Sequence, residues 1–159
     1  MSDLAIDVAR ADPGSADAQA LMDELSDILA AITGSSGRAS FDPDDVRAPR
    51  ACFAIARDAH GRALGCGAFR PLDGSVAEVK RMLARPGTTG VGSAVLGFLE
   101  AEAARLGFAQ LWLETRLVNA RAVAFYERRG YARIPNYGRY VGNDAAVCFA
   151  KTLPVDDTP

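Results

Sequence analysis

The pattern of apolar and polar positions predicts strands and helices along the whole chain. The segment 4–10 alternates apolar and polar residues, as a half-buried strand does. From 15 to 32 apolar residues recur at helical spacing, and TGSSG at 33–37 ends that helix. Two short apolar runs, ACFAIARD and ALGCGAFR, flank the turn HGR and predict a hairpin. The run SVAEVKRMLA then predicts a further strand.

The second half of the chain continues this alternation. A glycine-rich loop precedes a helix that the pattern places at 91–106, with Phe98 and Leu99 packing inward. The apolar segment AQLWLET predicts a strand with Trp112 in the core, and a helix begins near Asn119 and ends at Gly130. The chain closes with YARIPNYGRY and a final strand, AAVCFAKTL. The order β-α-β-β-β-α-β-α-β predicts a mixed α/β fold, whose mostly antiparallel central sheet contains a parallel strand–helix–strand crossover.

The composition narrows the class of protein. With 159 residues, 49% of them hydrophobic, we expect one domain over 1–153 and a flexible tail at 154–159. The net charge of −2 predicts no nucleic-acid partner, and no apolar run is long enough to cross a bilayer, so no membrane partner is expected. The three cysteines form no CxxC pair and His60 stands alone. We therefore expect no metal site, and reduced, mostly buried thiols in a cytoplasmic protein.

The segment RPGTTGVGS at 85–93 joins a strand to a helix and consists mainly of small residues. Unpaired N–H groups at a helix N-terminus attract anions, and glycine lets a phosphate approach the backbone. A dinucleotide fingerprint would need a third glycine where Val95 stands, and a Walker loop would need a lysine between Gly92 and Ser93. A loop that holds the diphosphate of coenzyme A needs neither, and a plain capped turn is the structural alternative.

Three segments together, EVKRMLARP…GVGSAVLGFLEAEA, LWLET and NARAVAFYERRGYARI, resemble the GNAT N-acetyltransferase superfamily. The resemblance covers 51–153, and the ending RIPNYGRYVGNDAAVCFAK is similar to a common bacterial, uncharacterised subgroup. It implies the GNAT-like acyl-CoA N-acyltransferase fold, with acetyl-CoA (coenzyme A) as the cofactor. The loop departs from the family pattern, because Gly87 stands where arginine or glutamine is usual and the segment is shorter. We therefore expect weaker coenzyme A binding than a full loop would give.

By this resemblance, the coenzyme lies against the loop, the strand before it and the start of the last helix. The residues assigned to it are Met82, Leu83, Ala84, Thr88, Thr89, Gly90, Val91, Gly92, Ser93, Asn119 and Tyr126. At 82–84 the contact would come from backbone groups of an irregularly paired strand, and a bulge there would explain why the strand lacks a clean apolar face. Asn119 also suits the N-cap of its helix.

Acetyl transfer to an amine requires one group that accepts the amine proton and another that supplies a proton to the thiolate. Glu78 resembles the strand carboxylate that some family members use as the base, and its structural alternative is an ion pair with a neighbouring arginine or lysine. Glu114, at the end of LWLET, is the second candidate base. Tyr126, with a phenol pKa of about 10, is the candidate acid, and its structural alternative is a core tyrosine.

The expected acceptor is a primary amine of a small molecule or peptide, which attacks the thioester directly in a ternary complex. Tyr137 and Tyr140 in the loop PNYGRY, together with Glu114 and the segment 36–50, are assigned to its pocket. Two other functions stay open. One is an acyl-CoA sensor or catalytically degenerate relative, and the other is a nucleotide triphosphatase using GTTGVGS, which the missing lysine disfavours. A homodimer stays open as the oligomeric state.

Overall fold

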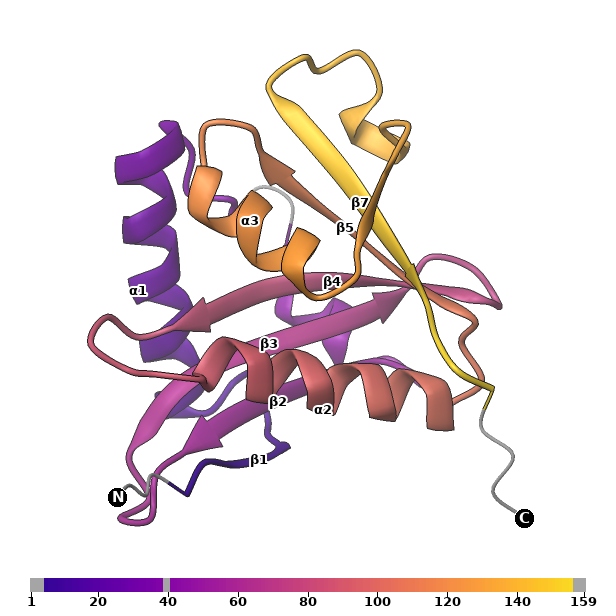
Figure 1. The fold of residues 1–159 in the computed structure, drawn as a ribbon. Coiled ribbons are helices and arrows are strands. Elements are labelled where there is room, and N and C mark those ends of the chain that lie inside the picture. Colours follow the sequence, from indigo (N-terminus) through magenta and orange to yellow (C-terminus); the bar gives the residue numbers. More distant parts are fainter. Residues whose placement is uncertain (1–4, 39–40, 156–159) are drawn as a thin grey trace.

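The computed structural model describes residues 5–38 and 41–155, where a seven-stranded sheet carries three α-helices (Figure 1). The elements are, in chain order, β1 (Asp7–Arg10), α1 (Ala16–Thr33), β2 (Cys52–Arg57), β3 (Ala63–Pro71), β4 (Val76–Ala84), α2 (Val91–Arg105), β5 (Gln110–Arg116), α3 (Ala120–Arg128), β6 (Ala132–Ile134) and β7 (Ala146–Thr152). Short 3-10 helices lie at Pro43–Val46 and Gly138–Tyr140. The strand order is β1-β2-β3-β4-β5-β7-β6, with β4 and β5 parallel and the other pairs antiparallel. The expected mixed α/β fold is confirmed.

Local sequence signals determine where the helices begin and end. Ser15 caps α1 by accepting a hydrogen bond from the N–H of Ala18 at 3.2 Å, and Gly34 closes this helix at a φ of 81°. Asn119 caps α3 by accepting from the N–H of Ala122 at 3.3 Å, as predicted. The sequence does not predict β6, a three-residue strand that pairs with β7. Residue 4 of the expected first strand and residues 156–159 of the expected tail lie outside the described residues.

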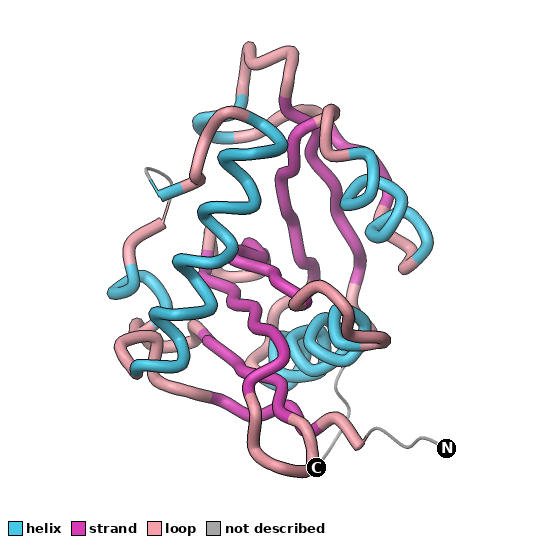
Figure 2. The backbone as a smooth tube through the Cα atoms, turned by 90° about the vertical axis from the view of Figure 1, so that its left-hand side faces the viewer, coloured by secondary structure: helices cyan, strands magenta, loops and turns pink. Residues whose placement is uncertain are grey.

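Two apolar layers cover the sheet, one on each face. On one face α2 packs over a core that includes Ala54 and Phe69, and on the other α1 packs over Phe53 and Ile55. Successive strand residues point to opposite faces, so each central strand serves both layers. Figure 2 shows α1 running along one side of the sheet, away from α2 and α3. None of the helices in the described part of the chain is long and apolar enough to cross a membrane.

β4 and β5 separate after a short run of parallel pairing. Residues 76–78 of β4 pair with residues 110–112 of β5, after which β4 continues against β3 and β5 against β7. The ribbon in Figure 1 shows the two strands diverging from this point. The diverging strands therefore form the two sides of a wedge within the sheet.

The burial of individual side chains confirms most of the expected core. The three cysteines are free thiols and are all buried, and Leu99 is fully buried in α2. The prediction that Trp112 lies in the core is wrong, because this residue is only partly buried. It lies on β5 between Leu111 and Leu113, and these two leucines take the core face of the strand. The alternation of a strand therefore turns Trp112 to the opposite face.

Candidate active site

A cavity of about 210 Å³ lies between the diverging strands. β4 lines it with residues 78–82, and β5 lines it with residues 113–116. The remaining lining residues are Leu25, Leu29 and Thr33 of α1, Ser35 and Gly37 of the loop after α1, Asn119, Ala122 and Tyr126 at α3, and Arg139 and Tyr140 before β7. The wedge is thus closed by segments that lie far apart in the sequence.

A bulge in β4 shapes one side of the cavity. Two residues, Arg81 and Met82, oppose the single Gly67 of β3. Arg81 has a φ of 55°, a left-handed conformation that costs a residue with a Cβ about 1–2 kcal/mol. A Cβ on Gly67 would lie 2.5 Å from the sulfur of Met82 and 2.7 Å from Cγ1 of Val95, so a larger residue opposite the bulge would displace these packed side chains. The bulge expected from the sequence pattern is confirmed.

The side chain of Arg81 connects the bulge to α1. Its Nη2 donates to the backbone oxygen of Met22 at 2.7 Å and to Oγ of Ser26 at 2.6 Å, and its Nη1 donates to the backbone oxygen of Ser36 at 3.4 Å. Arg81 is 9% exposed, and its burial lowers the pKa of the guanidinium. Its Nε is buried without a hydrogen-bond partner among the described residues. Arg81 therefore holds a buried positive charge beside the cavity.

Glu78 is the more buried of the two carboxylates in the cavity lining, with 2% of its side chain exposed. Its Oε1 lies 3.0 Å from Nη2 of Arg70 and 3.7 Å from Nζ of Lys80, while its Oε2 accepts a hydrogen bond from the hydroxyl of Tyr137 at 2.6 Å. The ion pair that the sequence left as an alternative is therefore present. Both carboxylate oxygens have partners, and a role for Glu78 as the base stays a prediction.

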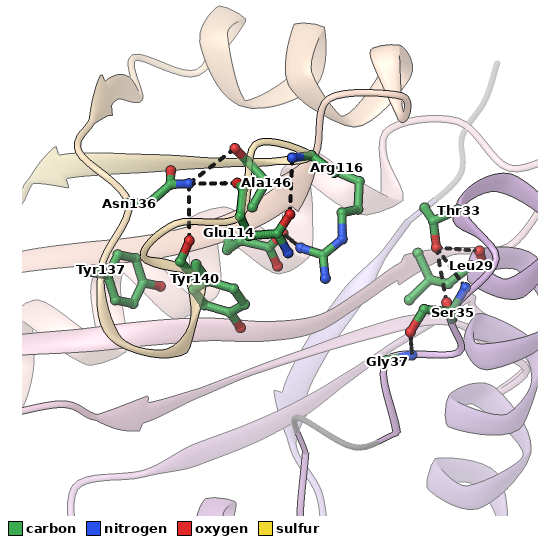
Figure 3. A network of polar contacts seen from close by, with 12 residues as sticks. Leu29, Thr33, Ser35, Gly37, Glu114, Arg116, Asn136, Tyr137, Tyr140 and Ala146 are labelled. Carbon is green, nitrogen blue, oxygen red and sulfur yellow. Dashed lines mark hydrogen bonds and ion pairs between the residues drawn. The ribbon is translucent and has the colours of Figure 1, made fainter.

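Glu114 faces the cavity from β5, with 13% of its side chain exposed. Burial raises its pKa, and this effect outweighs the opposing effects of Arg116 and Lys80. Glu114 forms an ion pair with Arg116, whose guanidinium turns back toward the carboxylate (Figure 3). A carboxylate with a raised pKa holds a proton more readily, and this property suits Glu114 to accept one.

Tyr126 is a core tyrosine that also lines the cavity, and its role as the acid stays a prediction. Its ring lies among three aromatic rings, those of Phe125, Tyr131 and Phe149, at centroid distances of 5.1, 5.7 and 6.5 Å. The residue is 8% exposed, and its burial raises the pKa of the phenol. It also lines the cavity, and its hydroxyl forms no hydrogen bond with any described residue. The ring is therefore part of the core, while the residue reaches the cavity wall near the helix cap Asn119.

The loop before β7 is held in place by Asn136. Its Nδ2 donates to the backbone oxygens of Tyr140, Asn143 and Ala146, at 3.2, 3.0 and 3.4 Å (Figure 3). One amide thus fixes the curvature of the whole loop. The loop carries both tyrosines that the sequence assigns to the acceptor pocket.

These two tyrosines contact the charged residues of β4. Tyr137 donates its hydroxyl to Glu78 and packs its ring against Trp112, with the centroids 5.0 Å apart. The hydroxyl of Tyr140 accepts a hydrogen bond from Nζ of Lys80 at 3.2 Å. Tyr140 lines the cavity itself, whereas Tyr137 is outside the lining and contacts the lining residue Glu78.

The glycine loop ends at the start of α2. Gly90 has a φ of 78°, and no side chain caps the helix. The hydroxyl of Thr88 donates to the backbone oxygen of Arg85 at 2.6 Å, and Oγ of Ser93 accepts from Nε of Arg129 at 2.9 Å. The two hydroxyls therefore already have protein partners. The N–H groups of the first turn of α2, in contrast, have no capping side chain, as an anion-binding helix start requires.

This helix start fits the diphosphate of coenzyme A. Thr89 and Gly90 are exposed, and the loop leads directly from β4, which lines the cavity, to the uncapped helix. Gly92 has a second role in packing, because a Cβ there would lie 3.0 Å from the ring of Phe125. The absence of a side chain at Gly92 thus lets α3 approach α2 closely.

The cavity brings together six of the residues assigned from the sequence. These are Glu78, Met82, Glu114, Asn119, Tyr126 and Tyr140. Leu83 instead packs toward α1, and Ala84 pairs with Gly65, so neither lines the cavity. The assigned loop residues, 88–93, lie at the start of α2.

Four cationic lining residues were missed by the sequence reasoning: Lys80, Arg81, Arg116 and Arg139. For the first two a signal was present. They are consecutive basic residues inside the otherwise apolar strand VAEVKRMLA. Charged residues are rarely buried unless they are paired or functional, so this pair could have been noted.

Comparison with known proteins agrees with this geometry. The family model described as Acetyltransferase (GNAT) family matches residues 18–131. IAA acetyltransferase of Azospirillum brasilense is 29% identical over 151 residues, which cover 93% of this chain and 98% of that protein. A Klebsiella pneumoniae protein, provisionally assigned as an acyl-CoA N-acyltransferase, has a solved structure with 25% identity and a TM-score of 0.78, covering 93% of this chain and 97% of that one.

A GNAT family acetyltransferase from Elizabethkingia anophelis, solved with acetyl-CoA bound, shares the fold at 13% identity. The TM-score is 0.68, and the match covers 93% of this chain and 98% of that one. The GNAT family uses acetyl-CoA, the cofactor expected from the sequence. Since the family model matches most of the chain, the protein belongs to the GNAT family of acetyltransferases.

Proposed function

We propose that this protein transfers the acetyl group of acetyl-CoA to a primary amine of a small molecule or peptide, by direct attack in a ternary complex. One observation carries the proposal. The cavity between β4 and β5 brings the Tyr126 side chain and the two carboxylates, Glu78 and Glu114, into one lining. A candidate proton donor and candidate proton acceptors therefore meet in a space that the diverging strands leave open.

Residues at two places would hold acetyl-CoA. The N–H groups at the start of α2, after Gly90, suit the diphosphate, and the bulged backbone at Arg81 and Met82 suits the acyl end. When bound, acetyl-CoA supplies a thioester carbonyl that an amine can attack. Backbone donors aimed at the oxygen of such a carbonyl stabilise its developing negative charge.

The amine must lose a proton before or during the attack, because alkyl amines have a pKa of about 10.4. Glu114 is our candidate for the group that accepts this proton, directly or through water, since burial raises its pKa. Glu78, whose two oxygens are bonded to Arg70 and Tyr137, would instead fix the charges around the acceptor. In the balanced reaction the nitrogen bonds to the acetyl carbon and loses a proton, the carbon–sulfur bond breaks, and the departing thiolate receives a proton and becomes the free thiol.

Tyr126 is our candidate for the donor of that last proton. Its buried phenol has a raised pKa, so it keeps the proton throughout the neutral pH range. Its hydroxyl has no protein partner among the described residues that would hold it away from the cavity. The same burial places the hydroxyl where bulk water does not compete.

The test measures the release of free thiol from acetyl-CoA across a panel of primary amines. We expect Tyr126→Phe to lower kcat by about 10²-fold without weakening acetyl-CoA binding, as is usual for the loss of a general acid. The matched control is Tyr131→Phe, which removes a phenol that bonds to Glu100 away from the cavity. Binding of acetyl-CoA without amine-dependent thiol release would support a sensor instead, and equal kcat values in the two variants would exclude Tyr126 as the donor.

A further inference from the structure

The cavity between β4 and β5 is lined by more positive than negative side chains. Its cationic residues are Lys80, Arg81, Arg116 and Arg139, and its carboxylates are Glu78 and Glu114. The chain as a whole has a net charge of −2. The positive surplus is therefore a local property of the cavity and does not follow from the composition.

Both carboxylates already have cationic partners in the protein. Glu78 pairs with Arg70 at 3.0 Å and lies 3.7 Å from Lys80, and Arg70 adds its charge from outside the cavity lining. Glu114 pairs with Arg116. Neither carboxylate is therefore left to neutralise Arg81.

Within residues 5–38 and 41–155, Arg81 is buried without a carboxylate partner. Its hydrogen-bond partners are two backbone oxygens and the hydroxyl of Ser26, all of them neutral, and its Nε has none among the described residues. Asp23 raises the pKa of Arg81 and Arg38 lowers it, and these two side chains form an ion pair with each other at 3.0 Å. A buried charge without a counter-charge is unfavourable, so the site gains when an anion enters the cavity.

Arg81 lies at the α1 end of the cavity. Arg81 bonds to α1 and to the loop after it, and residues 25, 29, 33, 35 and 37 of this segment line the cavity. On the other strand, Arg116 lies beside Glu114, with which it forms an ion pair (Figure 3). The α1 end is thus suited to an anion, while Glu114 is suited to an amine.

We propose that the acceptor amine carries a carboxylate, which binds at the α1 end of the cavity near Arg81 while the amine lies toward Glu114. This inference rests on the proposed function and names the class of its substrate. The carboxylate supplies the counter-charge that Arg81 does not find among the described residues. An acceptor without an anionic group would leave that charge buried and unpaired, and would therefore bind more weakly.

The first test compares matched substrates on the unaltered protein. A series of ω-amino acids of increasing chain length is set against the corresponding ω-amino amides, which differ only in the loss of the negative charge. Thiol release from acetyl-CoA gives kcat/KM for each compound. At the best chain length we expect the acid to exceed the amide at least about tenfold, as charge-assisted hydrogen bonds give. Equal values for acid and amide at every length would overturn the inference.

The second test removes the charge from the protein. Arg81→Met should raise the ratio of KM for the best acid to KM for its amide about tenfold, with partial recovery of this ratio in Arg81→Lys. Arg139→Gln is a second variant at an exposed position of the lining. The matched control is Arg62→Gln, which removes a charge at the hairpin turn, where the Arg62 side chain is 75% exposed. If Arg81→Met affects acid and amide equally, Arg81 has a structural role only and the inference fails.

The two proposals fail in different ways. If acetyl-CoA binds and no amine of either series releases thiol, the proposed acetyl transfer is wrong and the substrate class falls with it. If the amides react as well as the acids, acetyl transfer stands and only the carboxylate-binding site is wrong. If the Arg81 variants do not fold, as judged by circular dichroism, the comparison of acid with amide decides alone.

Discussion

Two glycines of α2 offer a direct test of how closely this helix approaches α3. Gly92 lies in the first turn of α2, and Gly97 lies near its middle. A Cβ at Gly97 would meet nothing within 4 Å, whereas a Cβ at Gly92 would lie 3.0 and 3.1 Å from two ring atoms of Phe125. The substitutions Gly92→Ala and Gly97→Ala therefore make the same chemical change in two different surroundings.

The expected magnitudes follow from these distances. Alanine stabilises a helix relative to glycine by about 0.5–1 kcal/mol, and at Gly97 nothing opposes this gain. At Gly92 the ring of Phe125 must retreat by about 0.5 Å to restore ordinary contact between carbon atoms. The guanidinium of Arg129 lies 3.9 Å from the ring centroid, so the retreat disturbs packed groups. Overpacking of this kind costs about 1–3 kcal/mol, so we expect Gly92→Ala to be less stable than Gly97→Ala by at least about 1 kcal/mol.

Urea denaturation of the two variants and the unaltered protein measures this difference. We expect Gly97→Ala to raise the free energy of unfolding and Gly92→Ala to leave it unchanged or lower it. For each kcal/mol of difference in stability between the two variants, the melting temperature of Gly92→Ala should lie about 2–4 °C below that of Gly97→Ala. Because Tyr126 follows Phe125 on α3, thiol release should fall in Gly92→Ala and not in Gly97→Ala. Equal stabilisation by both substitutions would refute the close approach of the two helices.

Two further predictions concern the charged groups of the cavity. Burial raises the pKa of Glu114, so the carboxylate form that a base needs is lost at a higher pH than for an ordinary glutamate. We therefore expect kcat/KM to fall as the pH falls through this raised pKa. Glu114→Gln should lower kcat by about 10²–10⁴-fold and abolish this fall of kcat/KM at low pH. If the fall persists unchanged in Glu114→Gln, another group is responsible for it. Tyr137→Phe should cost about 1–3 kcal/mol in urea denaturation, because it leaves Oε2 of the buried Glu78 without its 2.6 Å hydrogen bond. Tyr131→Phe should cost less stability, because its acceptor Glu100 keeps a hydrogen bond from Lys151 at 3.1 Å. A larger loss of stability in Tyr131→Phe than in Tyr137→Phe would contradict this account of the Tyr137–Glu78 hydrogen bond.

The predictions from sequence succeeded where local patterns determine the structure. Helical spacing and the capping residues Ser15 and Asn119 located α1 and α3, and the broken apolar pattern of SVAEVKRMLA indicated a bulge. Trp112 was predicted wrongly because its apolar character was weighed above its position between two core leucines. β6 was not predicted because three residues ending before Pro135 are too short to show a period.

The contacts of the candidate site could not be predicted in the same way, since they join segments distant in sequence. Tyr137 and Glu78 are separated by 59 residues, and so are Arg81 and Met22. No local pattern encodes such pairs. Their geometry depends on where β4 leaves β5 and on how Asn136 folds its loop.

The bulge also explains how adjacent basic residues of β4 can serve one site. In a regular strand, Lys80 and Arg81 would point to opposite faces of the sheet. Lys80 pairs with Ala68, whose side chain belongs to the α1 face, and the left-handed backbone of Arg81 turns its guanidinium to the same face, where it bonds to Ser26. The extra residue then restores the alternation, so that Met82 contacts the α2 core. The local irregularity that disturbs the ladder therefore also concentrates positive charge on the α1 side of the cavity, and the acceptor that we propose depends on it.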